Sequence, residues 1–181
     1  MNWILNLFLS TIGRKLIVSL TGLFLILFLS VHVSGNFLLL KGDGGMAFNE
    51  YSEFMSSNGL IQVVAWATKV LILLHVLQTI LLTIKNRNAR PESYAYNKPG
   101  SSSSWSSRNM MIMGSLILIF LIIHLKTFWF EFHYGSVQMT TYNPDMPDYY
   151  AVVKAAFSEL WYVVLYLLAL VGLSFHLWHG F

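Results

Sequence analysis

Four long apolar stretches constrain the fold of this 181-residue chain more than any other feature. They run approximately over residues 16–40, 60–84, 110–132 and 155–181. Each is long enough to cross the hydrocarbon core of a bilayer as a helix, which needs about 20 residues. The stretches lack the alternation of a barrel strand, and only helices or closed barrels satisfy every backbone polar group in lipid. The sequence therefore predicts an all-α membrane protein, a transmembrane helical bundle with four spans.

The composition also indicates an integral membrane protein, because 56% of the residues are hydrophobic and only 10% are charged. The four spans and their loops use the whole length, so we expect a single transmembrane domain, residues 1–181, without a soluble catalytic domain. The absence of cysteine excludes disulfides, thiolate zinc sites and cysteine-bound iron–sulfur clusters within this polypeptide. The net charge of +3 has no clustered run behind it, so nothing points to nucleic acid.

The charged residues of the loops predict how the spans are oriented. Cations precede the first span and fill the second loop, whereas the first and third loops carry mainly carboxylates. By the positive-inside rule, the N-terminus and the second loop face the cytoplasm. We therefore expect a multi-pass protein of the bacterial cytoplasmic (inner) membrane. The cations are Arg14, Lys15, Lys85, Arg87, Arg90, Lys98 and Arg108, and the carboxylates are Asp43, Glu50, Glu53, Asp145 and Asp148.

One histidine lies deep within each apolar stretch: His32, His75, His124 and His176. An imidazole in the bilayer needs a polar partner, so an intramembrane histidine suggests a functional site. At a rise of about 1.5 Å per residue, His32 and His124 lie in the outer halves of their spans. His75 and His176 lie in the inner halves. The four therefore form two pairs at two depths, His32 with His124 and His75 with His176, each across a diagonal of an antiparallel bundle.

Two imidazoles facing each other across a helical bundle are typical axial ligands of a b-type haem. Two such pairs predict two haems b in the bundle interior. The chain has no C-x-x-C-H motif, which excludes covalent attachment of a c-type haem. Gly172, one turn before His176, and Gly35, about one turn after His32, are expected to leave room for a porphyrin.

Two further histidines and one further class of protein stay open as alternatives. His179 lies three residues after His176 on nearly the same helical face and competes with it as the inner ligand. His133 lies at the outer end of the third span, where an interfacial imidazole is ordinary. A haem-free alternative is a transporter or metal-handling protein whose histidines relay protons or bond between helices.

Short segments, at least one in each span, carry a resemblance to a known family. They are Ser10 to Lys15 with Thr21-Gly22, Val31 to Asn36, Leu74-His75, His124-Leu125, and Phe175 to Gly180. In this order they resemble the cytochrome b membrane-anchor subunit of succinate:quinone oxidoreductases, in the form with one anchor polypeptide and two haems b. The resemblance covers nearly the whole chain. It implies the same four axial ligands in the same pairs, and it favours His176 over His179.

The resemblance also implies partners and an activity. A flavoprotein subunit would oxidise succinate or reduce fumarate, and an iron–sulfur subunit would dock on the inner face. This chain would anchor both, as part of a succinate dehydrogenase or fumarate reductase, and pass electrons between the clusters and membrane quinone, with menaquinone expected. The dicarboxylate chemistry lies outside this chain. The alternative within the same class is the cytochrome b subunit of a hydrogenase, a formate dehydrogenase or another quinone-linked dehydrogenase.

The chain departs from the family's pattern in two places. The family has five spans and four are visible here, so we expect the chain to be truncated before the fifth. Some fumarate reductases of the family carry a membrane glutamate two residues before the fourth ligand, where it is linked to proton transfer. Ser174 stands at that position here, which leaves that proton route without its glutamate.

Four polar residues are candidates for contacts with quinone or haem. Glu53 resembles in position the family's acidic residue implicated in menaquinol chemistry, with Glu50 or a merely solvated loop carboxylate as alternatives. Lys69 and Lys126 lie inside the outer halves of their helices, where a cation needs a counter-charge or must reach the surface. They are expected to pair with haem propionates or to snorkel. Arg14 is expected to hold an inner propionate or to help dock the soluble subunits.

Overall fold

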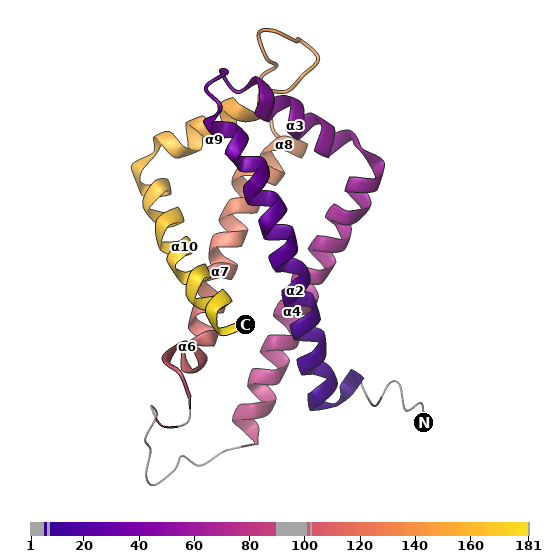
Figure 1. Cartoon of the computed structure of the whole chain (residues 1–181), viewed down its shortest axis with the longest axis vertical. Coiled ribbons are helices and arrows are strands. Elements are labelled where there is room, and N and C mark those ends of the chain that lie inside the picture. Colours follow the sequence, from indigo (N-terminus) through magenta and orange to yellow (C-terminus); the bar gives the residue numbers. More distant parts are fainter. Residues whose placement is uncertain (1–5, 7, 90–100, 102, 181) are drawn as a thin grey trace. The chain divides into compact units, whose positions relative to one another are not determined.

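The computed structural model of the chain describes residues 6, 8–89, 101 and 103–180, and within this part every regular element is a helix (Figure 1). Two of the predicted loop cations, Arg90 and Lys98, lie outside the described residues. The elements are α2 (Thr11–Asn36), η1 (Phe37–Leu40), α3 (Met46–Ser57), α4 (Gly59–Asn88), α6 (Trp105–Arg108), α7 (Met110–His124), η2 (Leu125–Phe130), α8 (Glu131–Tyr134), α9 (Tyr149–Ser158) and α10 (Leu160–Gly180).

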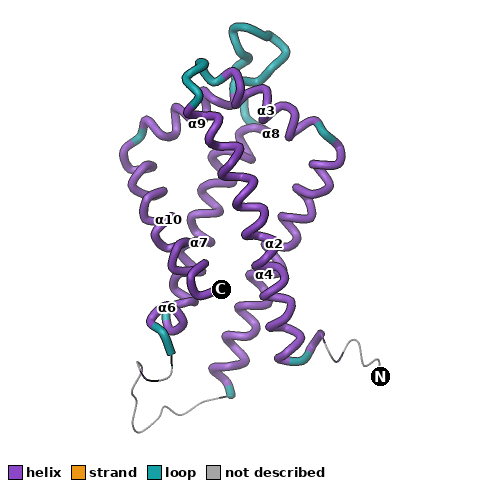
Figure 2. The backbone as a smooth tube through the Cα atoms, in the orientation of Figure 1, coloured by secondary structure: helices purple, strands orange, loops and turns teal. Residues whose placement is uncertain are grey.

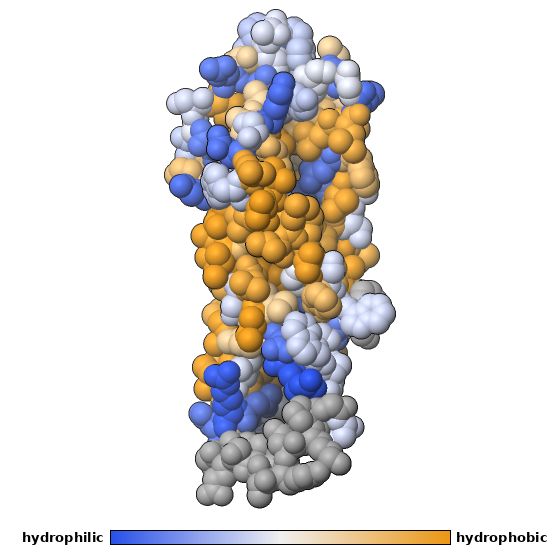
Figure 3. Space-filling model, turned by 90° about the vertical axis from the view of Figure 1, so that its left-hand side faces the viewer, coloured by the Kyte–Doolittle hydropathy of each residue, from blue (hydrophilic) through white to orange (hydrophobic). Residues whose placement is uncertain are grey.

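Four of the helical stretches are long and apolar enough to cross a membrane, which confirms the prediction of four such spans. They are Thr11–Leu40, Gly59–Asn88, Met110–Tyr134 and Leu160–Gly180. Their large apolar side chains are mostly exposed, including Leu40 at 80% and Leu60 at 76%. On the face shown in Figure 3, hydrophobic residues cover the middle parts of the helices. Such surfaces are stable in lipid rather than in water, so the chain is a multi-pass membrane protein.

The first span begins earlier and the fourth begins later than the hydropathy predicted. The Ser10 hydroxyl accepts a hydrogen bond from the Gly13 N–H at 3.0 Å and so caps a helix that already starts at Thr11. Near the fourth span, the Asp148 carboxylate caps α9 by accepting from the Ala151 N–H. Glu159 then adopts an extended conformation, with φ −87° and ψ 115°, and separates α9 from α10. Residues 155–158 therefore belong to a separate short helix.

The described chain divides into two units. The first holds residues 1–33 and 59–101, and the second holds residues 34–58 and 102–181. In the first unit, two side-chain contacts join α2 to α4: Arg14 donates to Gln78 Oε1 at 3.2 Å, and Thr21 Oγ1 lies 3.0 Å from His75 Nδ1. In the second unit, α10 packs against α7 and α9, and α3 packs against α9. Figure 2 shows the loop that joins α8 to α9 in this unit.

A buried asparagine fixes α3 to the start of α9 within the second unit. Asn49 is only 1% exposed. Its Nδ2 donates to Asp148 Oδ1 at 3.0 Å and to the Tyr142 hydroxyl at 3.3 Å, and its Oδ1 accepts from the Tyr150 N–H at 2.8 Å. Its amide is thus satisfied on both sides, as a buried polar group must be. These bonds hold the helix that carries Glu53 against the helix that carries Tyr149.

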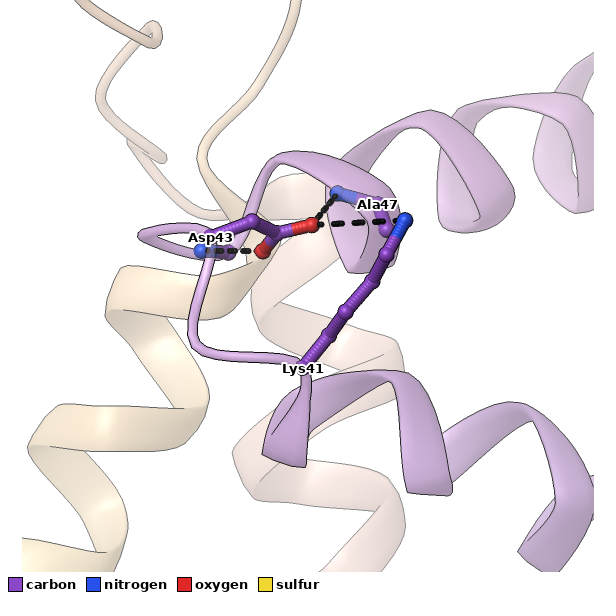
Figure 4. A network of polar contacts seen from close by, with 4 residues as sticks. Lys41, Asp43 and Ala47 are labelled. Atoms are coloured by element: carbon purple, nitrogen blue, oxygen red, sulfur yellow. Dashed lines mark hydrogen bonds and ion pairs between the residues drawn. The ribbon is translucent and has the colours of Figure 1, made fainter.

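A tight turn before α3 sets where that helix begins (Figure 4). Asp43 accepts hydrogen bonds from the Gly45 N–H at 3.0 Å and the Ala47 N–H at 3.1 Å, and Lys41 Nζ lies 3.8 Å from its Oδ2. Desolvation by itself would raise the pKa of the Asp43 carboxyl. The two backbone bonds and the Lys41 charge outweigh it, so this pKa lies below its ordinary value.

Candidate functional site

Each of the four spanning helical stretches carries one of the predicted histidines. His32 lies in α2, His75 in α4 and His176 in α10, and His124 ends α7. Each predicted pair takes one histidine from the first unit and one from the second. Within the described part of the chain, no three His, Cys, Asp or Glu side chains gather as a metal site. A haem needs fewer ligands from the protein, because two imidazoles complete the coordination of its iron.

The contact between His75 and Thr21 favours one tautomer of the imidazole, with the proton on Nδ1. Thr21 Oγ1 lies 2.8 Å from the Ile17 carbonyl oxygen, 3.0 Å from that of Val18 and 3.0 Å from His75 Nδ1. A threonine hydroxyl has one proton, and the carbonyls can only accept. A hydroxyl that donates to these carbonyls accepts from the N–H at Nδ1. The lone pair of the neutral imidazole then sits on Nε2, the state in which a histidine can ligate a metal.

A glycine lies against the same imidazole. A Cβ placed on Gly22 would come 3.4 Å from His75 Cε1, which is ordinary van der Waals contact. Any side chain longer than alanine would press on the ring. Thr21 itself is only 5% exposed, so its hydroxyl is shielded from solvent. Thr21 and Gly22 thus both lie beside the Nδ1–Cε1 edge of the His75 ring.

The His124 imidazole has a similar arrangement in the second unit, built from tyrosines. Its Nδ1 lies 2.8 Å from the Tyr166 hydroxyl, which lies 3.1 Å from the hydroxyl of Tyr162. Phe120 and Phe128 flank the imidazole, with ring centroids 5.8 and 5.3 Å from it. The six-residue π-helical turn η2 begins directly after His124, and such turns occur frequently at functional sites.

Sequence reasoning did not identify either tyrosine. Tyr162 and Tyr166 are four residues apart on the fourth span and therefore share a helical face. A pair of phenols on one face of a membrane helix is a signal that could have suggested partners for an intramembrane imidazole. Which histidine they meet depends on the register of α10 against α7, and that register is not readable from the sequence.

His176 and His179 differ in their surroundings, although both lie on α10. A Cβ placed on Gly114 of α7 would come 3.8 Å from His176 Cε1, so His176 faces α7 across a glycine. His176 is half-buried, and His179 is exposed in the last turn of the helix. A Cβ placed on Gly172 would have no neighbouring atom within 4 Å, so there is open space beside this glycine, as predicted. Of the two imidazoles, His176 is therefore the more enclosed.

The expectation for Gly35 was wrong. A Cβ on Gly35 would overlap the ring of Tyr51, so the space beside this glycine is filled by a tyrosine from α3 and is not open to a porphyrin. The neighbouring His32 lies in the other unit and stacks on Phe28, with centroids 5.6 Å apart and ring planes at 21°. His133, the interfacial histidine, packs against Trp129 with the ring planes tilted by 30° and the centroids 4.8 Å apart, and its Nδ1 lies 2.8 Å from the carbonyl oxygen of that residue.

Glu53 has a buried phenol as its partner. The Tyr149 hydroxyl donates to Glu53 Oε2 at 3.0 Å and lies 3.5 Å from Ser56 Oγ. Tyr149 is 7% exposed, and burial raises the pKa of its phenol, with a further rise from the neighbouring Glu53 carboxylate. Glu50, the alternative, is exposed. Glu53 is therefore held in a defined position between two helices, which a merely solvated loop carboxylate would not require.

The three cations predicted to meet haem propionates have different surroundings. The Arg14 guanidinium donates to Gln78 Oε1 at 3.2 Å and to the Leu9 carbonyl at 3.3 Å. Lys69 Nζ lies 4.1 Å from the centre of the Trp66 ring, a cation–π contact. Lys126 is exposed on the turn that follows His124. The contacts of Arg14 and Lys69 do not require a haem.

No protein-family model matches the chain, and no curated protein and no solved structure is detectably similar to it.

Proposed function

We propose that this chain is a dihaem cytochrome b that anchors a succinate:quinone oxidoreductase and moves electrons between its iron–sulfur subunit and membrane quinone. The observation that carries the proposal is the set of four histidines, one in each spanning stretch. The contact of His75 with Thr21 supports it, because an imidazole that donates from Nδ1 to this hydroxyl keeps its lone pair on Nε2. Imidazole held at Nδ1 by an outer partner is the usual state of a metal-bound histidine.

The proposed ligand pairs are His32 with His124 and His75 with His176. They rest on the depths of the histidines in their spans, on the predicted topology and on the resemblance. The glycines next to His75 and His176 support the proposal, because a ring that receives a flat macrocycle needs small neighbours. When bound, the haems would supply one-electron chemistry, and the protein would set their potentials through the ligands and the groups that contact them.

We place the quinone near Glu53. Reduction of a quinone is coupled to protonation, so its site needs a group that can exchange a proton or a hydrogen bond with the headgroup. Glu53 is such a group: the Tyr149 hydroxyl donates to its carboxylate, and the Ser56 hydroxyl lies 3.5 Å from that of Tyr149. The proposed quinone is menaquinone, from the resemblance. The alternative carboxylate, Glu50, is exposed.

The proposed partners are the flavoprotein subunit, which carries the succinate or fumarate chemistry, and the iron–sulfur subunit. Both would bind at the cytoplasmic side of a bacterial inner membrane, with the N-terminus of this chain on that side. The distribution of loop cations supports this orientation. Arg14 and Lys15, at the start of the first span, would lie at the docking side.

The spectrum of the purified chain in detergent tests the proposal. We expect a Soret band, a reduced α-band and about two haems per chain. His→Ala changes at each of the four positions should each reduce the haem content, whereas His179→Ala should not. The complex should show succinate:quinone activity. A colourless preparation would overturn the haem proposal and favour a transporter, and haem without a flavoprotein partner would favour another quinone-linked cytochrome b.

A further inference from the structure

The partner of His124 differs in kind from the partner of His75. Thr21 is an aliphatic hydroxyl whose own proton is bonded to backbone carbonyls. Tyr166 is a phenol that is bonded to a second phenol, Tyr162, at 3.1 Å. His75 is thus held by one hydroxyl, whereas His124 is held by two phenols that are hydrogen-bonded to each other. The effect of this difference on haem potential, argued below, rests on the proposed function.

The direction of the hydrogen bonds follows from the ligand role. If His124 binds iron through Nε2, its Nδ1 carries the proton and donates to the Tyr166 oxygen at 2.8 Å. Tyr166 then turns its own proton to Tyr162. A hydroxyl that donates a hydrogen bond becomes a better acceptor, because bonds in a chain polarise one another. Tyr162 therefore strengthens the bond from His124 to Tyr166.

The surroundings of Tyr166 and Tyr162 strengthen the hydrogen bonds that link His124 to these two phenols. Tyr162 is 2% exposed, so water does not compete for its hydroxyl. Phe120 and Phe157 pack edge-on against Tyr166, with centroids 4.8 and 4.7 Å away. Hydrogen bonds in such a low-dielectric setting are stronger than in water. The rings also fix the phenol, so the angle of the His124 imidazole follows from the position of Tyr166.

We propose that Tyr166, supported by Tyr162, is a positioning residue that lowers the redox potential of the haem bound by His124. The hydrogen bond from Nδ1 increases the electron donation of Nε2 toward the iron. Ferric haem carries one more positive charge than ferrous haem, so stronger donation favours the oxidised state. Removing the phenol hydroxyl weakens donation and should raise the potential of this haem alone.

A potentiometric titration of both haems in the purified complex tests this. The haem of His124 is identified as the signal that His124→Ala removes. In Tyr166→Phe we expect both haems to be retained. The redox potential of the His124 haem should rise, and the potential of the second haem should not change. Tyr162→Phe should shift the same haem upward by a smaller amount. Thr21→Val should instead shift the redox potential of the His75 haem. Thr21→Ser keeps a hydroxyl and should leave that potential as in the unchanged protein.

Tyr142→Phe is the matched control, since its hydroxyl bonds to Asn49 and Met146 rather than to a histidine. It should move neither potential. A downward shift, no shift, or an equal shift of both haems in Tyr166→Phe contradicts the proposal. If Tyr166→Phe does not fold, Tyr162→Phe decides alone, and no shift in it is equally contradictory. Absence of haem from the unchanged protein would instead reject the proposed function.

Discussion

The Tyr149 hydroxyl lies 3.0 Å from Glu53 Oε2 and bonds the first turn of α9 to α3. Because burial and the Glu53 carboxylate raise the pKa of Tyr149 above its ordinary value of 10.0, the folded chain holds this proton more tightly than the unfolded chain. The contribution to stability is complete below about pH 10 and is lost as the pH rises through the folded pKa.

We therefore expect the unfolding temperature to fall more steeply above about pH 10 in the unchanged protein than in Tyr149→Phe. Glu53→Gln should reduce the alkaline loss, because it removes the charge that opposes phenolate formation. Thermal unfolding in detergent at a series of alkaline pH values measures both effects. Equal alkaline slopes in the unchanged protein and in Tyr149→Phe would show that the phenol does not titrate as described.

Two glycines in the turn before α3 provide a matched pair of substitutions. Gly42 has φ +74° and open space where a methyl group would stand, whereas Gly45 has φ +91° and its Cβ would overlap the ring of Tyr150. Gly42→Ala should cost about 1 kcal/mol, the penalty for a left-handed alanine. Gly45→Ala should cost about 3 kcal/mol, because overlap in a packed site adds to that penalty. Denaturant unfolding of both variants measures the difference, and equal losses would exclude the contact with Tyr150.

The stability of the contact between α3 and the start of α9 should be especially sensitive to substitution of Asn49. Asn49→Ala leaves the Tyr150 N–H without its acceptor and Asp148 Oδ1 without one donor. Asp148 Oδ1 keeps the bond from the Ala151 N–H, and a shielded polar group that loses its partner costs about 1–3 kcal/mol. We expect a total loss of about 2–4 kcal/mol by thermal unfolding, with faster amide exchange at the start of α9. Ser57→Ala, on the exposed side of the same helix, is the control and should change neither.

Hydropathy was sufficient to predict the four spans, because the bilayer imposes a length and a composition on each of them. It was less informative at their ends. The fourth span was predicted from residue 155, yet Asp148 caps α9 and Glu159 is extended. Caps and single extended residues are local events that a hydropathy average conceals.

The candidate site was predictable only in part. The histidines are conspicuous because imidazoles are rare in lipid. Their partners are ordinary residues, and the contact of Tyr166 with His124 depends on packing between two helices. Gly35 shows the opposite error: a small residue indicates space, but only the fold shows that Tyr51 fills it. Thr21-Gly22 was noted as part of the resemblance, without the role that its contacts with His75 now suggest.

Gly22 offers a test of how closely the His75 ring must be held. A methyl group on Gly22 would only touch His75 Cε1, at 3.4 Å, so Gly22→Ala should keep both haems. The larger side chain in Gly22→Leu should push the imidazole away from Thr21 and break the 3.0 Å bond at Nδ1. Because outer partners orient the ring of a metal-bound histidine, we expect Gly22→Leu to lose one of the two haems.

Haem content per chain, measured as the pyridine haemochrome, separates the outcomes for Gly22. Gly59→Leu is the control at a glycine of the same unit with open space around its Cβ, and it should retain the haem content of the unchanged protein. Thr21→Val combined with Gly22→Leu should lose no more haem than Gly22→Leu alone, because both act on the same ring. Two haems with unchanged potentials in Gly22→Leu would mean that the ring held by Thr21 is not a haem ligand.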